Sequence, residues 1–184
     1  RGRTLQRVRK AYMYEYASFI YNGKPLDVNV ESNESLKQLF YNCLSPSDCE
    51  DLVCLYLYDK ANYIAIPSTN KIATELYECV LVNPENGMLA YPQVLNGKLA
   101  YPQVKKGNKE LNSNDYIELI KDNPNKEVYL FTSEGMVQDD IHIDNIHSIS
   151  PDELYSWTKE KIESNSFLIP ESIVKWYKLI HSSE

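Results

Sequence analysis

Long apolar runs are absent from this chain of 184 residues. None approaches the roughly 20 consecutive apolar residues that a membrane-spanning helix requires, so we expect no membrane partner. No segment combines the charged, apolar and small-residue regions of a secretory signal. The content of 43% hydrophobic and 24% charged residues is that of an ordinary globular protein. These features predict a soluble cytoplasmic domain that is large enough to bury a core.

Cysteine is scarce, and none of the four cysteines forms a Cys-x-x-Cys motif. Structural zinc sites and the disulfide frameworks of small secreted domains are built from clustered cysteines. Cys43, Cys49, Cys54 and Cys79 lie instead within otherwise apolar patterns. The sequence therefore argues against a zinc site and is consistent with a reducing cytoplasm.

Positive charge is also in short supply, because 19 Lys and Arg against 26 Asp and Glu give a formal net charge of -7. Affinity for phosphates grows with the number of cations brought to them, so we do not expect the whole surface to coat nucleic acid. A local patch of basic residues can still bind nucleic acid. The basic clusters are Arg1, Arg3, Arg7, Arg9 and Lys10 at the start of the sequence, and Lys105, Lys106 and Lys109 in its middle. The first cluster is typical of a solvated helix face.

Hydrophobic periodicity predicts an α/β protein. Helical spacing occurs over residues 5–21, 36–43, 47–60, 113–121, 150–162 and 170–180, and strand patterns occur over residues 26–30, 63–67, 76–82, 127–132 and 141–149. This order predicts a mixed β-sheet flanked by helices. The expected division is an N-terminal helical extension (1–44), a core (45–135), and a C-terminal strand and helices that pack on the core (136–184).

The clearest helix start is at Ser45-Pro46, because serine is a favourable N-cap and proline is favourable in the first turn. Ser47 and Glu50 have the spacing of a capping box, in which the glutamate reaches back to the start of the helix. The apolar stripe of this helix leaves Glu50 on the flank of its buried face. Glu50 is therefore either a capping residue or a carboxylate that is available for function.

A nine-residue segment is duplicated. Residues 86–94 (NGMLAYPQV) recur as residues 96–104 (NGKLAYPQV) with one change. Asn-Gly is a strong signal for a tight β-turn, so either copy could form a hairpin with the strand before it. Pro92 and Pro102 are unusual in an inner strand, because proline lacks the N–H that a neighbouring strand would bind.

Three registers follow from the duplication. A turn at the first Asn-Gly would place Glu78 opposite Leu95. Expulsion of residues 86–97 as a loop would place Glu78 opposite Lys105, and the second copy would then form the strand. A meander with two tight turns would direct Glu78 away from Gln103. We favour the second register, since it brings a carboxylate and an ammonium to one face.

Three short segments occur in a recognisable order: SPSDCE (45–50) opens a helix, YEC (77–79) lies on a strand, and QVKKG (103–107) lies on the next strand. Together they resemble the Mrr-like branch of the PD-(D/E)xK nuclease superfamily, which has a restriction-endonuclease-like core. The following helix and the strand over residues 128–131 fall where that fold places its later elements. The resemblance implies a metal-dependent DNA endonuclease, such as one of a restriction or defence system.

Phosphodiester hydrolysis requires a divalent cation that neutralises the phosphate and activates water, and a second cation near the attacking oxygen. The resemblance implies Glu50, Glu78 and Gln103 as ligands of Mg2+ or Mn2+, which prefer oxygen donors. Gln103 stands where the family pattern usually has Asp or Glu, and it would make a weaker, neutral contact. Lys105 would orient the water and stabilise charge, so Glu78, Gln103 and Lys105 are the expected catalytic residues.

DNA is the partner that this hypothesis implies, and a homodimer is a further expectation because such domains often act as dimers on duplex DNA. Two alternatives remain open. One is a catalytically inactive nuclease-like domain that binds nucleic acid or protein. In this alternative the negative net charge and the duplicated segment have impaired the site. The other is a purely structural α/β module. The endonuclease requires Glu78 and Lys105 to converge on one point, whereas the structural module leaves them far apart.

Overall fold

The computed structural model describes residues 33–66, 77–83, 98–121, 125–138 and 143–181. The chain divides into two compact units, one formed by Arg1–Leu44 with Pro170–Glu184 and one formed by Ser45–Ile169. The helix expected over residues 5–21, the strand expected over residues 26–30, the first copy of the duplication and the basic cluster at the start all lie outside the described residues.

The smaller unit contains two described helices, α2 (Asn33–Cys43) and α6 (Glu171–His181). Both confirm helices that the apolar spacing predicted. They pack through aromatic rings: Phe40 meets Tyr177 edge to face, with 6.3 Å between the ring centroids. Both side chains are buried, so this contact is part of the unit's apolar core.

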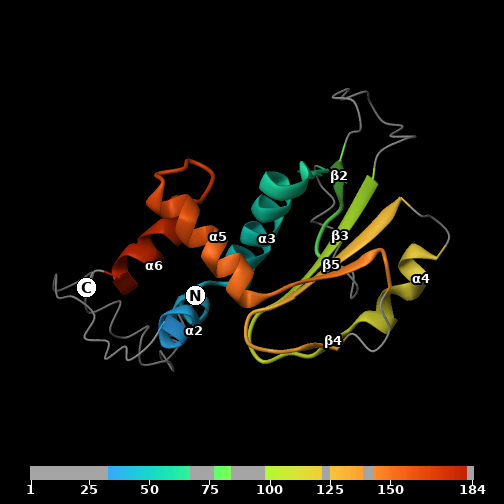
Figure 1. Cartoon of the computed structure of the whole chain (residues 1–184), viewed down its shortest axis with the longest axis horizontal. Helices are drawn as coiled ribbons and strands as arrows, with labels where there is room; N and C mark the ends of the chain where they lie inside the picture. Colours follow the sequence, from blue (N-terminus) through green and yellow to red (C-terminus); the bar gives the residue numbers. More distant parts are fainter. Residues whose placement is uncertain (1–32, 67–76, 84–97, 122–124, 139–142, 182–184) are drawn as a thin grey trace, which may run out of the picture. The chain divides into compact units, whose positions relative to one another are not determined.

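The larger unit is built on a five-stranded sheet with the order β1-β2-β3-β5-β7 (Figure 1). Its strands are β1 (Ile64–Ala65), β2 (Leu81–Asn83), β3 (Lys98–Lys105), β5 (Lys126–Thr132) and β7 (Ile146–Ile149). Strand β2 is antiparallel to both β1 and β3, whereas β3, β5 and β7 run parallel to one another. The predicted α/β fold with a mixed sheet is confirmed. A small parallel pair, β4 (Leu111–Asn112) with β6 (Val137–Gln138), was not predicted, because two residues give no periodic signal.

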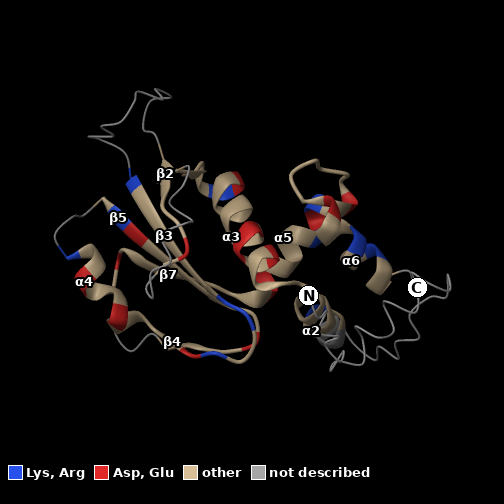
Figure 2. Ribbon diagram, turned by 180° about the vertical axis from the view of Figure 1, so that it is seen from behind, with Lys and Arg blue, Asp and Glu red and all other residues tan. Residues whose placement is uncertain are grey.

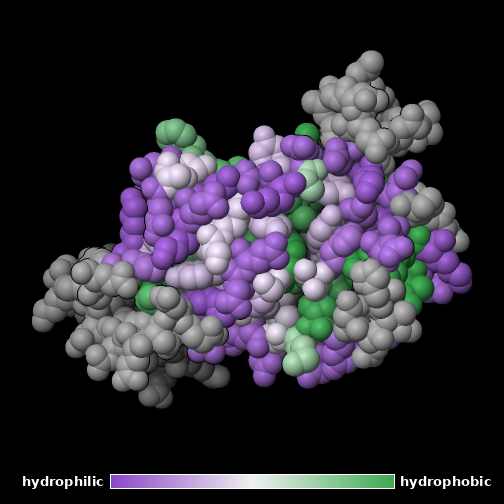
Figure 3. Space-filling model, in the orientation of Figure 1, coloured by the Kyte–Doolittle hydropathy of each residue, from purple (hydrophilic) through white to green (hydrophobic). Residues whose placement is uncertain are grey.

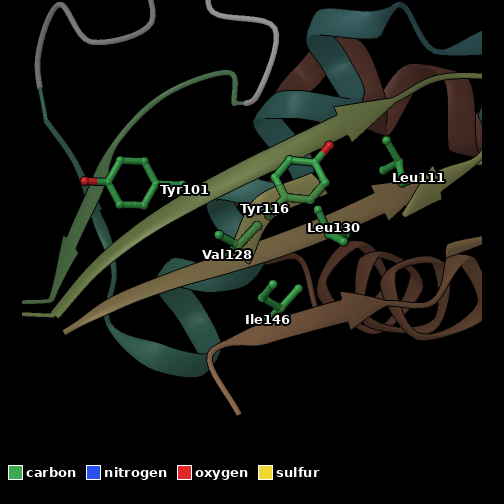
Figure 4. Close-up of a cluster of buried hydrophobic side chains, with 6 residues drawn as sticks. All are labelled: Tyr101, Leu111, Tyr116, Val128, Leu130 and Ile146. Atoms are coloured by element: carbon green, nitrogen blue, oxygen red, sulfur yellow. The ribbon is translucent and has the colours of Figure 1, made fainter. Parts of the chain in front are cut away.

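Helices cover both faces of this sheet (Figure 1). Helix α3 (Pro46–Ala61) lies on one face, and the short elements η2 (Ser113–Tyr116) and α4 (Ile117–Ile120) lie on the other. Alternating residues of the parallel strands face η2 and α4 and bury an apolar cluster (Figure 4). Its members are Tyr101, Leu111, Tyr116, Val128, Leu130 and Ile146.

Helix α5 (Pro151–Glu163) packs against α3. The rings of Tyr56 and Trp157 meet edge to face with 5.5 Å between their centroids. The Trp157 indole donates a hydrogen bond of 2.9 Å to Asp59, and the Tyr56 hydroxyl donates one to Glu153. These paired polar groups hold the two helices together at the edges of their apolar contact.

The start of α3 corrects the predicted capping box. Pro46 is the first helical residue, so the box is formed by Ser45 and Asp48 and not by Ser47 and Glu50. The Asp48 N–H donates to Ser45 Oγ at 3.1 Å, and the Ser45 N–H donates to Asp48 Oδ2 at 2.7 Å. Glu50 lies two residues beyond the box and is not used as a cap.

Strand β2 pairs with the second copy of the duplication. Leu81 lies opposite Ala100 and Asn83 lies opposite Lys98, which is two residues away from the register that would place Glu78 opposite Lys105. A shift of two residues keeps every side chain on its predicted face. Regular pairing is also shorter than expected, since the strand predicted over residues 76–82 begins at Leu81.

Pro102 explains why β2 is short. The Leu99 N–H donates to Asn125 beside β5, so the odd residues of β3 direct their N–H groups to β5 and the even residues direct theirs to β2. The N–H that Pro102 lacks would therefore have bound the segment before β2. Only the Pro102 carbonyl contributes there, accepting a 2.9 Å hydrogen bond from the Glu78 N–H. An inner proline is tolerated because its neighbour is irregular at that point.

The start of β5 carries a buried carboxylate, that of Glu127. Glu127 accepts hydrogen bonds from Tyr63 at 2.7 Å, Tyr129 at 2.8 Å and Lys98 at 2.7 Å. Burial would raise the pKa of Glu127, but the hydrogen bonds from Lys98, Tyr63 and Tyr129 outweigh it and hold the pKa below its ordinary value. The folded protein therefore favours the ionised form.

Glu127→Gln is expected to lower the free energy of unfolding by about 1–3 kcal/mol at pH 7, since hydrogen bonds to a charged acceptor are lost. Because the folded pKa is lowered, this stabilisation is complete above the unfolded pKa of about 4.3 and is lost as the pH falls through the folded pKa. Urea unfolding from pH 7 downward measures the difference. Glu118→Gln, at an exposed i,i+3 ion pair with Lys121, is the control and should change little. A Glu127 variant whose deficit does not shrink in acid would contradict this account.

Candidate active site at the carboxyl end of β3

Glu78 and Lys105 converge. The Lys105 ammonium lies 3.2 Å from Glu78 Oε1, although the two residues come from different segments of the chain. The Lys105 side chain is 39% exposed and the Glu78 side chain is 25% exposed, so the pair remains accessible to a ligand. Exposed ion pairs contribute little to stability, and this one is therefore a weak explanation of the fold.

Backbone contacts set the position of both residues. Glu78 precedes β2 and is held beside β3 by the hydrogen bond from its N–H to Pro102. Lys105 is the last residue of β3, and its carbonyl accepts a 3.0 Å hydrogen bond from the Ser133 N–H. The long lysine side chain reaches back along the sheet to the carboxylate. Because β3 and β5 are parallel, the pair lies at the carboxyl ends of strands, where α/β sheets commonly bind ligands.

Glu50 lies within the electrostatic field of this pair. Burial raises the pKa of the Glu50 carboxyl, the negative charges of Glu78 and Asp51 raise it further, and Lys105 acts in the opposite direction. Glu78 and Lys105 thus both act on the Glu50 carboxyl at the first turns of α3. Since Asp48 forms the helix cap, the Glu50 side chain is available to this cluster.

Gln103 is buried, with 1% of its surface exposed. It lies two residues before Lys105 on β3, so the two side chains project from the same face of the strand. In the parallel ladder Gln103 is opposite Leu130 of the apolar cluster. An ionised residue at this buried position would pay a large desolvation cost, whereas an amide offers an oxygen without charge.

Tyr116 is a neighbour of the site that the sequence did not single out. Burial raises the pKa of Tyr116 to about 12, with further contributions from Asp115 and Glu78. The phenol therefore stays protonated at neutral pH and can donate a hydrogen bond near Glu78. With 15 tyrosines in the chain, composition could not identify this one. The Asn112 cap at the start of η2 was the only local signal.

The loop after Lys105 is fastened to the end of β5. Thr132 Oγ1 lies 3.1 Å from the Gly107 carbonyl oxygen and 3.0 Å from that of Lys109, and the Gly107 N–H donates a 2.8 Å hydrogen bond to Ser133 Oγ. Thr132 and Ser133 are buried. These contacts give the loop a defined course beside the candidate site.

This loop also carries the basic cluster in the middle of the sequence. Lys105, Lys106 and Lys109 lie at the end of β3 and on its connection to β4, where Figure 2 shows basic positions. Burial raises the pKa of Cys49 to about 12, and Lys106 opposes that shift, so its ammonium lies near the first turn of α3. Lys105 thus lies beside the carboxylates of Glu78 and Glu50, and Lys106 lies near the same turn of α3.

The candidate ligands form a sparse set. Among the residues that the structure describes, no three His, Cys, Asp or Glu side chains form a group that could hold a metal ion. Magnesium often binds through one or two carboxylates and keeps several waters. The two carboxylates Glu78 and Glu50 fit that open mode and do not fit a closed protein cage, whereas the Gln103 side chain is buried and would have to become accessible to contribute its oxygen.

Hydrophobic side chains on the surface are scattered. The large exposed ones in the described part of the chain are Tyr58, Ile64, Met136 and Phe167, and they belong to different segments. The face in Figure 3 is mainly hydrophilic, with smaller hydrophobic areas. The homodimer therefore stays a prediction. Within the described ranges, every helix is too short or too polar to cross a membrane.

Comparisons with known proteins return no relative. No protein-family model matches the chain, no curated protein matches it, and no solved structure matches it. The case for a function consequently depends on the geometry of the site.

Proposed function

We propose that the unit Ser45–Ile169 is a nuclease domain of the PD-(D/E)xK type, which hydrolyses DNA phosphodiester bonds with Mg2+ or Mn2+. The observation that carries the proposal is the 3.2 Å approach of Lys105 to Glu78 at the carboxyl end of β3. A structural module without a site gives no reason for these residues to converge and stay accessible. The order of elements, with a helix, three antiparallel strands, a helix and a parallel strand, also agrees with the resemblance.

Each residue has a distinct role in this proposal. Glu78 and Glu50 hold the cation through their carboxylates, and Gln103 offers a neutral oxygen from the same face of β3 as Lys105. The bound cation supplies charge neutralisation at the phosphate and a more acidic water. Lys105 orients the attacking oxygen and stabilises the charge that develops on the phosphate.

The local charge pattern supports a polyanionic substrate. The chain is acidic overall, with a net charge of -7, yet Lys106 and Lys109 lie on the loop that begins at the site. A phosphate backbone that follows this loop would meet the ammonium groups of Lys106 and Lys109 beside the scissile bond. The proposal therefore includes contacts to the backbone, which are insensitive to DNA sequence.

A second candidate, an inactive nuclease-like domain, has one observation in its favour. The Lys105 ammonium bonds directly to Glu78, and with the neutral Gln103 it lowers the negative charge available to a cation. A domain of this kind would retain DNA binding through its lysines. It would not bind Mn2+ in a manner that depends on Glu78.

Incubation of the purified chain with supercoiled plasmid tests the proposal. We expect nicked and linear DNA to accumulate with Mg2+ or Mn2+ and no cleavage when EDTA replaces the metal. Isothermal titration with Mn2+, without DNA, measures metal binding independently. Cleavage that persists in EDTA would contradict the metal-dependent mechanism. If the chain binds DNA but neither cleaves it nor binds Mn2+, the result would favour the inactive domain.

A further inference from the structure

We propose that Cys54 and Cys79 form a reversible intramolecular disulfide, which makes them an oxidative modification site next to the candidate active site. Their sulfur atoms are 3.6 Å apart in the thiol form. Cys54 lies on α3, and Cys79 lies in the segment that leads into β2. The contact therefore joins two elements that are 25 residues apart in sequence.

The separation is short enough for a bond without rearrangement of the fold. A disulfide has an S–S length of about 2.0 Å, so the two sulfur atoms need to approach by only about 1.6 Å. Side-chain rotation about the Cα–Cβ bonds can provide much of that movement. The other two cysteines, Cys43 and Cys49, are buried. Within the pair, Cys54 is half-buried and is the more accessible member, since Cys79 is 7% exposed.

The chemistry requires a peroxide as oxidant. The thiolate of one cysteine of the pair attacks one peroxide oxygen, the O–O bond breaks, and a sulfenic acid forms with release of water after proton transfer. The sulfur of the other cysteine then attacks that sulfur, the S–O bond breaks, and a second water leaves. Overall, two thiols are oxidised to one disulfide while one hydrogen peroxide is reduced to two waters. A dithiol reductant reverses the reaction by thiol exchange.

The position of the pair gives the bond a consequence for the site. Cys79 directly follows Glu78, and Cys54 is one helical turn beyond Glu50 on α3. A disulfide would therefore couple the two segments that carry these carboxylates. This consequence rests on the proposed nuclease function, whereas formation of the disulfide does not.

Peptide mapping of the full chain tests the modification. The reduced protein is treated with hydrogen peroxide, its remaining thiols are blocked with N-ethylmaleimide, and it is digested without reductant. Trypsin together with a glutamyl endopeptidase cuts after Lys60, Glu50 and Glu78, which separates Cys54 and Cys79 from each other and from the other cysteines. We expect a linked pair of peptides that contain Cys54 and Cys79, in a monomeric protein, and its loss after treatment with dithiothreitol.

Two variants sharpen the test. Cys79→Ala should abolish the linked peptide, whereas Cys43→Ala should leave the link intact. The proposal would be overturned if the peroxide-treated chain without substitutions showed no link, a different pairing, or a link between two molecules. Because the map requires neither metal nor DNA, failure of the nuclease assay does not affect it.

If the nuclease function holds, the oxidised protein should cleave plasmid at least about 10-fold more slowly than the reduced protein, since displacement of catalytic groups by about 1 Å is costly. Dithiothreitol should restore the rate, and Cys79→Ala should be insensitive to peroxide over the same range. An equal rate in the mapped, oxidised protein would overturn the coupling to the site but not the disulfide.

Discussion

Replacement of Lys105 by methionine is expected to reduce metal-dependent DNA cleavage by a factor of about 10²–10³, the usual loss when one group that stabilises transition-state charge is removed. Binding of Mn2+ should become tighter in the same variant. The Lys105 ammonium lies 3.2 Å from Glu78 Oε1, so it competes with a cation for that carboxylate. Methionine keeps the length of the side chain and removes the competing charge.

Glu78→Gln should have a different signature. It keeps the shape of the side chain but removes the charge that binds the cation, so both the Mn2+ affinity and the cleavage rate should fall. Titration calorimetry and initial cleavage rates at saturating DNA measure the two effects separately. The opposite responses of Mn2+ binding in the two variants distinguish a catalytic site from a surface ion pair, because loss of an ion pair alone changes stability by about 0–1 kcal/mol in either variant.

The ion pair between Lys159 and Glu163 on α5 provides matched controls. Lys159→Met and Glu163→Gln make the same chemical changes at an exposed i,i+4 pair, and neither should change cleavage or Mn2+ binding. Equal activity of Lys105→Met and Lys159→Met would remove Lys105 from the mechanism. Unchanged Mn2+ affinity in Glu78→Gln would remove Glu78 from the metal site.

Gly135→Ala is expected to destabilise the larger unit by at least about 3 kcal/mol, the upper part of the range for overpacking. A Cβ atom at this position would lie 1.8 Å from the carbonyl oxygen of Lys109. Backbone cannot move aside as the end of a side chain can, and both the Gly135 N–H and the Lys109 carbonyl are held by Thr132 Oγ1. The substitution therefore has to separate the loop from the end of β5. Denaturant unfolding and the thermal midpoint measure the loss.

Gly107→Ala is the matched comparison on the neighbouring loop, the one that carries Lys109. A Cβ atom there meets nothing within 4 Å, but the φ angle of +87° is unfavourable for alanine. Its expected cost is about 1–2 kcal/mol, from backbone strain alone. A larger loss for Gly107→Ala than for Gly135→Ala would show that backbone conformation, and not close approach, limits this loop.

Much of the secondary structure was predictable because its signals are local. Ser45-Pro46 marked the start of α3, and a short run of apolar residues marked β5. The capping box was placed on the wrong pair, since it depends on which residue is the first helical one. The shortened β2 was also missed, because the cause is Pro102 on the neighbouring strand, which no local pattern of residues 76–82 contains.

The candidate site was likewise predictable from the sequence only in part. The types and order of Glu50, Glu78, Gln103 and Lys105 could be read from the sequence, together with the α/β class of the chain, because spacing and residue chemistry are properties of short segments. The duplicated segment left three registers open, and tertiary pairing alone chose the second copy for β3. The approach of Lys105 to Glu78, the contact of Cys54 with Cys79 and the nearness of Tyr116 were decided only by the fold, since each joins side chains that are distant along the chain and become neighbours when the sheet and α3 pack.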